Sequence, residues 1–125
     1  MTSIRHFPAT HPLPDWRNFG VMLRVLLGVN LLALAVALTA EGLAFPVGHC
    51  GDVAMGGYLL GGGFGWNEGT WGPACHLIEK AEVVLADGRI VIVSETDHSE
   101  IFWALRGAGP LFFGIVTRYW LRLMP

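Results

Sequence analysis

The sequence predicts an α+β domain with a largely antiparallel sheet. Residues 80–94 have the pattern of two short strands around a turn, residues 97–107 that of a helix, and residues 113–123 that of a third strand. The order strand, strand, helix, strand with short turns is typical of this fold class. A chain of 125 residues makes one domain at most.

The composition is apolar for a free-standing domain of this size. Hydrophobic residues make up 53% of the chain and charged residues only 14%, where about 25% charged is usual. We therefore expect part of the surface to be covered by more protein, a cofactor or a membrane. The net charge of −2, with no basic block, argues against nucleic acid as a partner.

The N-terminal segment, residues 1–22, is predicted to be poorly ordered. It carries three prolines and no apolar periodicity. Its two histidines, His6 and His11, have no cysteine or carboxylate cluster beside them, so no metal site is expected. The domain itself is expected to occupy residues 23–125.

Residues 21–40 form an apolar run with two interpretations. Their length fits a membrane span. In the interpretation we favour, residues 23–29 are a buried strand, Asn30 caps a helix from about Leu31 to Glu41, and Gly42 ends that helix. Arg24 and Asn30 are costly at membrane depth, which favours the second interpretation and a cytoplasmic protein. Association with a membrane through residues 21–40 is the alternative.

Residues 45–72 hold ten of the seventeen glycines, placed between apolar residues. A flexible linker would be rich in serine and poor in large apolar side chains, so this stretch is not a linker. Such glycines let a backbone turn with positive φ or come close to something flat. Cys50 lies inside the stretch and Cys75 just beyond it; they make no disulfide framework, although one bridge between them stays open.

The second half gives the detailed expectations for the fold. Asp87-Gly88 between apolar runs predicts a hairpin with a type I′ turn. Asp97 and Glu100 resemble a capping box at the start of a helix that stops at Gly107. From residue 115, apolar and polar side chains alternate with a period of two, which predicts a strand with one wetter face.

Familiar catalytic motifs are absent from the sequence. It has no phosphate-binding P-loop, no Rossmann glycine pattern, no G-x-S-x-G elbow and no H-E-x-x-H. What remains is glycine, apolar side chains and Cys50, which suits a large, flat, partly apolar ligand. Cys50 has two interpretations, a reactive thiol beside His49 or a buried inert cysteine. No general base is nominated; Tyr58 and His76 are the nearest polar side chains.

The glycine-rich stretch resembles a known family. V-G-H-C-G-D-V-A-M-G-G-Y-L-L-G-G-G-F-G is similar to the flavin-facing segment of FAD-linked oxidases of the vanillyl-alcohol oxidase and p-cresol methylhydroxylase type (PCMH-type), in the branch that resembles berberine bridge enzyme. V-V-L-A-D-G, F-W-A-L-R-G-A-G and F-G-I-V-T follow in the family's order and spacing. The resemblance covers residues 27–125 and implies the second subdomain of a PCMH-type FAD-binding domain.

The resemblance implies the cofactor, FAD, and the residues that contact it. Those expected along the flavin and ribityl chain are Gly48, Cys50, Val53, Gly56 and Gly57, continued by Gly61, Gly62 and Gly63, with backbone contacts from Ile115 and Val116. Cys50 matches the cysteine that bonds to C6 of the flavin in some members. The implied chemistry is hydride transfer from an unknown small-molecule substrate to the flavin.

The sequence also departs from the family. It lacks an R-S-G-G-H-S-like loop, which in the family cradles the pyrophosphate, and it lacks the substrate domain. Ala54 replaces a glycine, and Leu111 stands where a small residue is common. We expect a fragment, inactive by itself, that works with the missing subdomain and substrate domain. The alternatives are a small single-span membrane protein and a non-catalytic interaction remnant.

Overall fold

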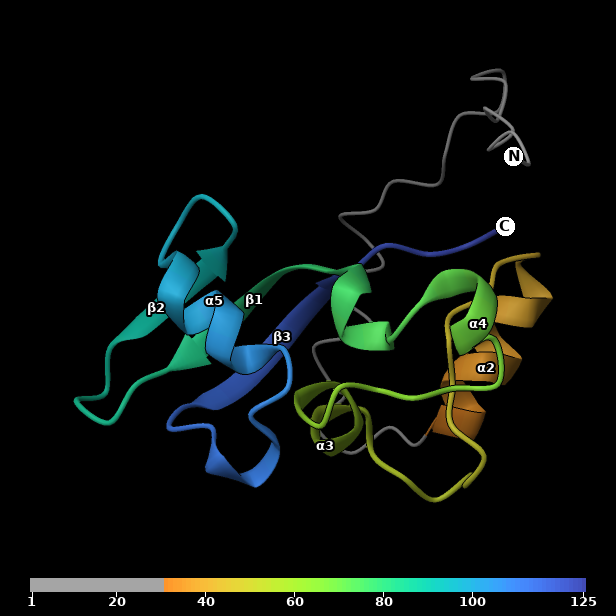
Figure 1. Cartoon of the computed structure of the whole chain (residues 1–125), viewed down its shortest axis with the longest axis horizontal. Coiled ribbons are helices and arrows are strands. Elements are labelled where there is room, and N and C mark those ends of the chain that lie inside the picture. The colour runs from red at the N-terminus through yellow and green to blue at the C-terminus, as the bar shows by residue number, and fades with distance from the viewer. Residues whose placement is uncertain (1–30) are drawn as a thin grey trace.

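The computed structural model describes residues 31–125, which form an α+β fold. A three-stranded sheet lies at one end of the molecule and the helices α2 and α4 lie at the other (Figure 1). The predictions for residues 1–22 and for a strand over 23–29 lie outside the described residues. The predicted α+β class with an antiparallel sheet is confirmed.

Helix α2 (Leu31–Ala40) matches the predicted helix and its ending. It buries Leu31, Leu34 and Leu38, which share one face at helical spacing. Gly42 adopts φ +68, its N–H donates to the Thr39 carbonyl and the next N–H donates to the Leu38 carbonyl. These two bonds are the Schellman arrangement that ends helices at glycine. Across residues 31–125, no helix is long and apolar enough to cross a bilayer.

The glycine-rich stretch folds as loops around short helices. These are α3 (Met55–Leu60), α4 (Glu68–Trp71) and the 3₁₀ turn η2 (Ala74–Leu77). The isolated bridge between Ala44 and Met124, with N–H···O distances of 2.8 Å in both directions, ties the start of this region to the end of the chain. The loops are thereby anchored to the sheet.

The sheet has the order β2-β1-β3 and both pairings are antiparallel. Strands β1 (Ile78–Val84) and β2 (Ile90–Ser94) form the predicted hairpin, but its predicted turn type is wrong. Only Gly88 has positive φ in the connection, and Leu85 N–H donates to the Arg89 carbonyl across it. The three residues between Leu85 and Arg89 make a longer loop, so a two-residue type I′ turn does not form.

Helix α5 (Ser99–Leu105) covers one face of the sheet (Figure 1). The predicted capping box is wrong, because no side chain caps this helix and its first residue is Ser99. The Asp97 carboxylate instead accepts hydrogen bonds from the Ser94 and Thr96 hydroxyls, both at 3.2 Å. The helix is followed by Gly107 with φ +136 and by the 3₁₀ turn η3 (Gly109–Leu111), so the predicted stop at Gly107 is confirmed.

Strand β3 (Ile115–Leu121) does not keep the predicted period of two. Val83 pairs with Val116, but Glu82 pairs with Arg118, so Thr117 is an extra residue in a bulge. The bulge reverses the alternation, and Val116 and Tyr119 both become buried. They join the core between the sheet and α5, whose other large members are Val83, Val93, Phe102 and Leu105.

Candidate functional site

Cys50 lies on an exposed turn that is fastened to the start of α2. The Val53 N–H donates to the Cys50 carbonyl at 3.4 Å, and the Leu31 N–H donates to the Val53 carbonyl at 2.9 Å. Both cysteines are free; Cys50 is exposed and Cys75 is buried. The disulfide that the sequence left open is therefore absent, and of the two thiols only that of Cys50 is accessible.

The ring of Tyr58 fills the space beside three glycines. A Cβ built at Gly48 would lie 3.2 Å from the ring, one at Gly63 would lie 3.1 Å from it, and one at Gly65 would lie 3.0 Å from the hydroxyl oxygen. The hydroxyl donates to the Pro46 carbonyl at 3.0 Å. A side chain at any of the three glycines would crowd this ring, so one side chain from α3 contacts both the loop before the helix and the loop after it.

The Gly61–Gly63 segment is bonded to η2 through its backbone. The Ala74 N–H donates to the Gly63 carbonyl at 2.8 Å, and the Cys75 N–H donates to the Gly62 carbonyl at 3.0 Å. Gly62 and Gly63 have positive φ and are buried, whereas Gly61 is exposed. The segment therefore offers one exposed edge, and its remaining backbone is tied into the fold.

The predicted site residues differ in how exposed they are. Gly57 is exposed and a Cβ there would meet nothing within 4 Å, while Gly61 lies against Gly109 of η3. Ile115 is exposed and Val116 is buried in the sheet. α3 and η3 pack together, so the edge of α3 is adjacent to the turn that leads into β3. The contact between α3 and η3 therefore brings the helix that carries Gly56 and Gly57 close to the turn that precedes Ile115 and Val116.

The contact between His49, which precedes Cys50, and Trp66 was not anticipated from the sequence. The rings of His49 and Trp66 are in contact, with centroids 3.9 Å apart and planes tilted by 41°. The backbone N–H of Trp66 also donates to the Val47 carbonyl at 3.3 Å, and this bond brings the end of the glycine-rich stretch close to the Cys50 turn. A residue separation of seventeen positions gives no local sequence signal for this contact. The same holds for Tyr58, whose role depends on three distant glycines.

Burial raises the pKa of two groups in the loops, Tyr58 and Cys75. Desolvation, with a smaller contribution from Glu68, raises the pKa of Tyr58 to about 12. Burial also raises the pKa of the Cys75 thiol, although the Arg106 charge opposes this. Both groups therefore stay protonated near neutral pH. In the described part of the chain, no cluster of three or more potential metal ligands occurs.

A family comparison identifies this domain. Residues 20–94 match the family described as "FAD binding domain". The chain belongs to this family. FAD-linked oxidoreductase nodO of Hypoxylon pulicicidum is 44% identical over 99 residues, which cover 79% of this chain and 21% of nodO. Xylooligosaccharide oxidase of Thermothelomyces thermophilus is 46% identical over 93 residues, covering 74% of this chain and 18% of that oxidase.

Similar solved structures support the same family assignment. Glucooligosaccharide oxidase from Acremonium strictum, described with a 6-S-cysteinyl, 8α-N1-histidyl FAD, superposes with a TM-score of 0.74 at 39% identity, covering 79% of this chain and 21% of that protein. A Physcomitrella patens protein described as BBE-like 1 gives 0.74 at 32% identity, with 78% and 21% covered. The chain is thus part of a PCMH-type FAD-binding domain, and it spans about a fifth of the length of these relatives.

The packing of Gly63 gives a first prediction, on stability. In Gly63→Ala the new Cβ would lie 2.6 Å from the Ala74 Cβ at a φ of +73. Left-handed strain and overpacking should together lower the free energy of unfolding by about 2–4 kcal/mol in denaturant titrations. The control is Gly69→Ala in α4, where nothing lies within 4 Å and the change should stay within about 1 kcal/mol. Equal effects in the two variants would contradict this account.

Tyr58 gives a prediction for alkaline pH. Its pKa is raised in the folded chain, so the fold favours the neutral phenol, and stability should fall as pH rises from about 10 towards about 12. Tyr58→Phe should flatten this fall in denaturant titrations, and it should cost about 1 kcal/mol at neutral pH because the bond to the Pro46 carbonyl is lost. Tyr119, whose pKa burial also raises, provides the control variant Tyr119→Phe, which keeps the Tyr58 contribution. A fall in Tyr58→Phe as steep as in the unmodified chain would count against the assignment.

Proposed function

We propose that this chain supplies one wall of the FAD site of an oxidase and that Cys50 bonds covalently to the flavin. The observation that carries the proposal is the free, exposed Cys50 thiol on a fixed turn. Two facts support it: the chain belongs to the FAD-binding family, and a solved relative is described with a 6-S-cysteinyl FAD. The substrate class does not follow from these residues.

The local chemistry fits a flat, partly apolar ring. Gly57 and Gly61 present backbone without side chains at an exposed edge, and Val53 and Leu111 add exposed apolar side chains. Glycine lets a ring come close to the backbone, and apolar side chains gain by being covered. We assign Gly57 and Gly61 to direct contact with FAD.

The other residues that we predicted along the flavin would contact it mainly through their backbone. Tyr58 takes the space that a side chain would need at Gly48, and Ala74 and Tyr58 take it at Gly63, so in the proposed site these two glycines act through their backbone. Val53 and Gly56 flank the start of α3, Gly62 continues the wall behind Gly61, and Ile115 and Val116 offer backbone groups at the start of β3. None of these roles requires a charged side chain.

FAD, when bound, supplies an acceptor for a hydride from a substrate C–H and passes the electrons to dioxygen. Cys50 would hold the ring in place. The new sulfur–carbon bond replaces the thiol S–H and one ring C–H, and these two hydrogens leave with two electrons to dioxygen, which becomes hydrogen peroxide. The fixed turn at residues 50–53 orients the sulfur for this bond.

The proposed partners of this chain are the parts of its relatives that lie outside the matched region. Leu111, Phe113 and Ile115 are exposed large apolar residues at alternate positions leading into β3, and Leu111 is 86% exposed. Apolar side chains gathered in this way mark surfaces that other protein covers. We assign this row to contact with the first FAD subdomain or the substrate domain, which agrees with the fivefold greater length of the relatives.

The test of the proposal is covalent flavin incorporation. The chain is incubated with FAD and dioxygen, alone and with the part of the Acremonium strictum oxidase that precedes the matched region, supplied as a separate polypeptide. We expect the denatured chain to stay yellow and to gain the mass of one FAD less two hydrogens. Cys50→Ser should abolish the mass gain, whereas Cys75→Ser should keep it. Covalent flavin in Cys50→Ser, or no bound flavin with or without the added polypeptide, would refute the proposal.

Gly57 gives a prediction that separates binding from folding. Gly57→Ala meets nothing within 4 Å and lies inside α3, so the free energy of unfolding should rise by about 0.5–1 kcal/mol. The added methyl group should push the flavin from the wall and weaken FAD binding by about tenfold. Flavin fluorescence quenching measures the affinity and denaturant titration the stability. Gly69→Ala is the control that should leave FAD affinity unchanged, and unchanged affinity in Gly57→Ala would remove this residue from the site.

A further inference from the structure

A groove runs over the face that carries α5, among residues that the flavin proposal does not use. Its larger hollow has a volume of about 610 Å³ and is lined by His76, Trp103, Ala104, Arg106, Gly107 and Ala108. A second hollow of about 280 Å³ shares His76 and continues past Ser94, Thr96 and Arg122. The larger volume falls in the range of small-molecule sites.

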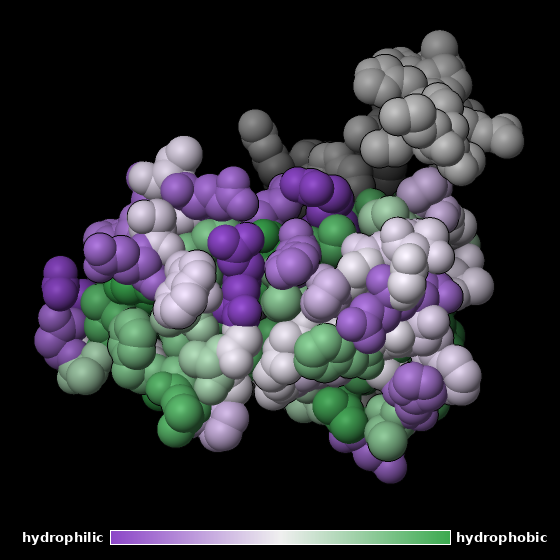
Figure 2. All heavy atoms as spheres, viewed as in Figure 1, coloured by the Kyte–Doolittle hydropathy of each residue, from purple (hydrophilic) through white to green (hydrophobic). Residues whose placement is uncertain are grey.

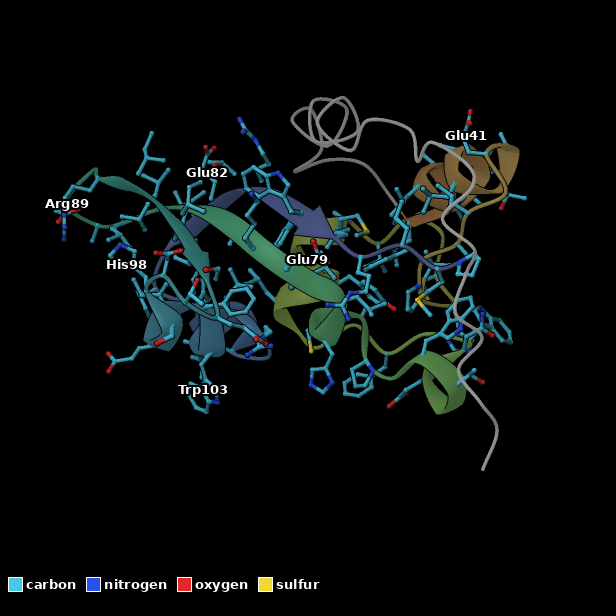
Figure 3. All side chains as sticks on the ribbon, turned by 90° about the horizontal axis from the view of Figure 1, so that it is seen from above. Glu41, Glu79, Glu82, Arg89, His98 and Trp103 are labelled. Atoms are coloured by element: carbon cyan, nitrogen blue, oxygen red, sulfur yellow. The ribbon has the colours of Figure 1, made fainter. Side chains whose placement is uncertain are left out.

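Trp103 forms an exposed aromatic wall of this groove. Helix α5 buries Phe102 and Leu105 against the sheet, which places Trp103 on the outer side. Trp103 is 76% exposed, and Figure 3 shows its side chain pointing away from the sheet, on the side opposite Glu82. An indole in this position offers a flat apolar surface and an N–H donor, and a ligand can reach both without any change in the fold.

The charges that line the groove cancel. Arg106 lies 3.5 Å from Glu95, and Arg122 lies 3.4 Å from Glu79. Among the residues that line the two hollows, two cations and two anions leave no net charge to favour either an ionic ligand or a metal ion. His76 adds an exposed imidazole between the two hollows.

Hydrogen-bonding groups are dense along the same path. The Ser94 and Thr96 hydroxyls lie 3.2 Å apart and both donate to the Asp97 carboxylate, which keeps them in place. Figure 2 shows hydrophilic residues along the upper part of this face and hydrophobic residues gathered lower down. These hydroxyl protons are donated within the protein, so the groove offers a ligand one aromatic plane, oxygen acceptors at Thr96 and Asp97, and the Arg106 and His76 side chains.

We propose that this groove is a non-catalytic binding site for a neutral oligosaccharide. The C–H face of a sugar ring would pack on the Trp103 indole, and its hydroxyls would bond to Arg106, His76 and the groups around Ser94. A neutral polyhydroxylated ligand fits the cancelled charges, because it gains from paired donors and acceptors without needing a counter-charge. Binding requires no flavin, so this site and the proposed FAD wall succeed or fail separately.

The test uses the 125-residue chain without FAD and xylobiose as the probe, followed by the indole N–H signals of a ¹⁵N-labelled sample. We expect saturable shifts of the Trp103 indole signal. In Trp103→Ala we expect binding about tenfold weaker, followed by the backbone amide signals of Arg106 and Gly107, which line the same hollow. Trp66→Ala is the matched control, since Trp66 is 71% exposed and lies beside Cys50 instead of the groove. It should bind xylobiose as the unmodified chain does.

Three results would overturn the proposal. They are the absence of any saturable shift at xylobiose concentrations of tens of millimolar, unchanged affinity in Trp103→Ala, and a loss that follows Trp66→Ala instead. Glucuronate and glucosamine serve as charged comparison probes, and tighter binding of either one than of xylobiose would contradict the charge argument. The dispersion of the amide signals shows in the same spectra that each variant is folded.

Discussion

The loop system depends on the close packing of one tyrosine ring against glycine. Tyr58 reaches from α3 to the positions of Gly48, Gly63 and Gly65, and its hydroxyl holds the Pro46 carbonyl. Side chains at these three glycines would crowd the ring, and at Gly63 and Gly65 they would also meet Ala74 and the Val47 carbonyl. The exposed Cys50 turn follows Gly48 by two residues, so its position is a consequence of this packing.

This constraint changes the meaning of the glycine-rich stretch. Its density suggested a backbone making room for an external flat ligand, but part of that room is taken by the protein's own side chain. Gly57 is different, because it faces open space and no packing within the described residues requires glycine there. In the site that we propose, glycines of the first kind build the wall, and Gly57 is the position at which the cofactor would approach it.

Features encoded by neighbouring residues could be predicted from the sequence, and features encoded by distant ones could not. The end of α2 at Gly42 and the β1–β2 hairpin follow from local turn chemistry and periodicity. The Tyr58 packing and the Thr117 bulge are set by residues far apart in the chain. For the site, Cys50 came from resemblance to a family, and the accessibility of its thiol required the structure.

The Thr117 bulge shows how such a tertiary feature connects the core to the proposed site. With strict alternation, Ile115 and Tyr119 would share a face, and burying one would bury the other. The extra residue lets Tyr119 pack in the core while Ile115 stays exposed at the start of the strand. The Thr117 hydroxyl donates to the Glu82 carboxylate at 2.8 Å, which fastens the bulge to β1. One irregular residue thus lets a single short strand bury a side chain in the core at one end and expose an apolar side chain at the other, where we propose that FAD and other protein bind.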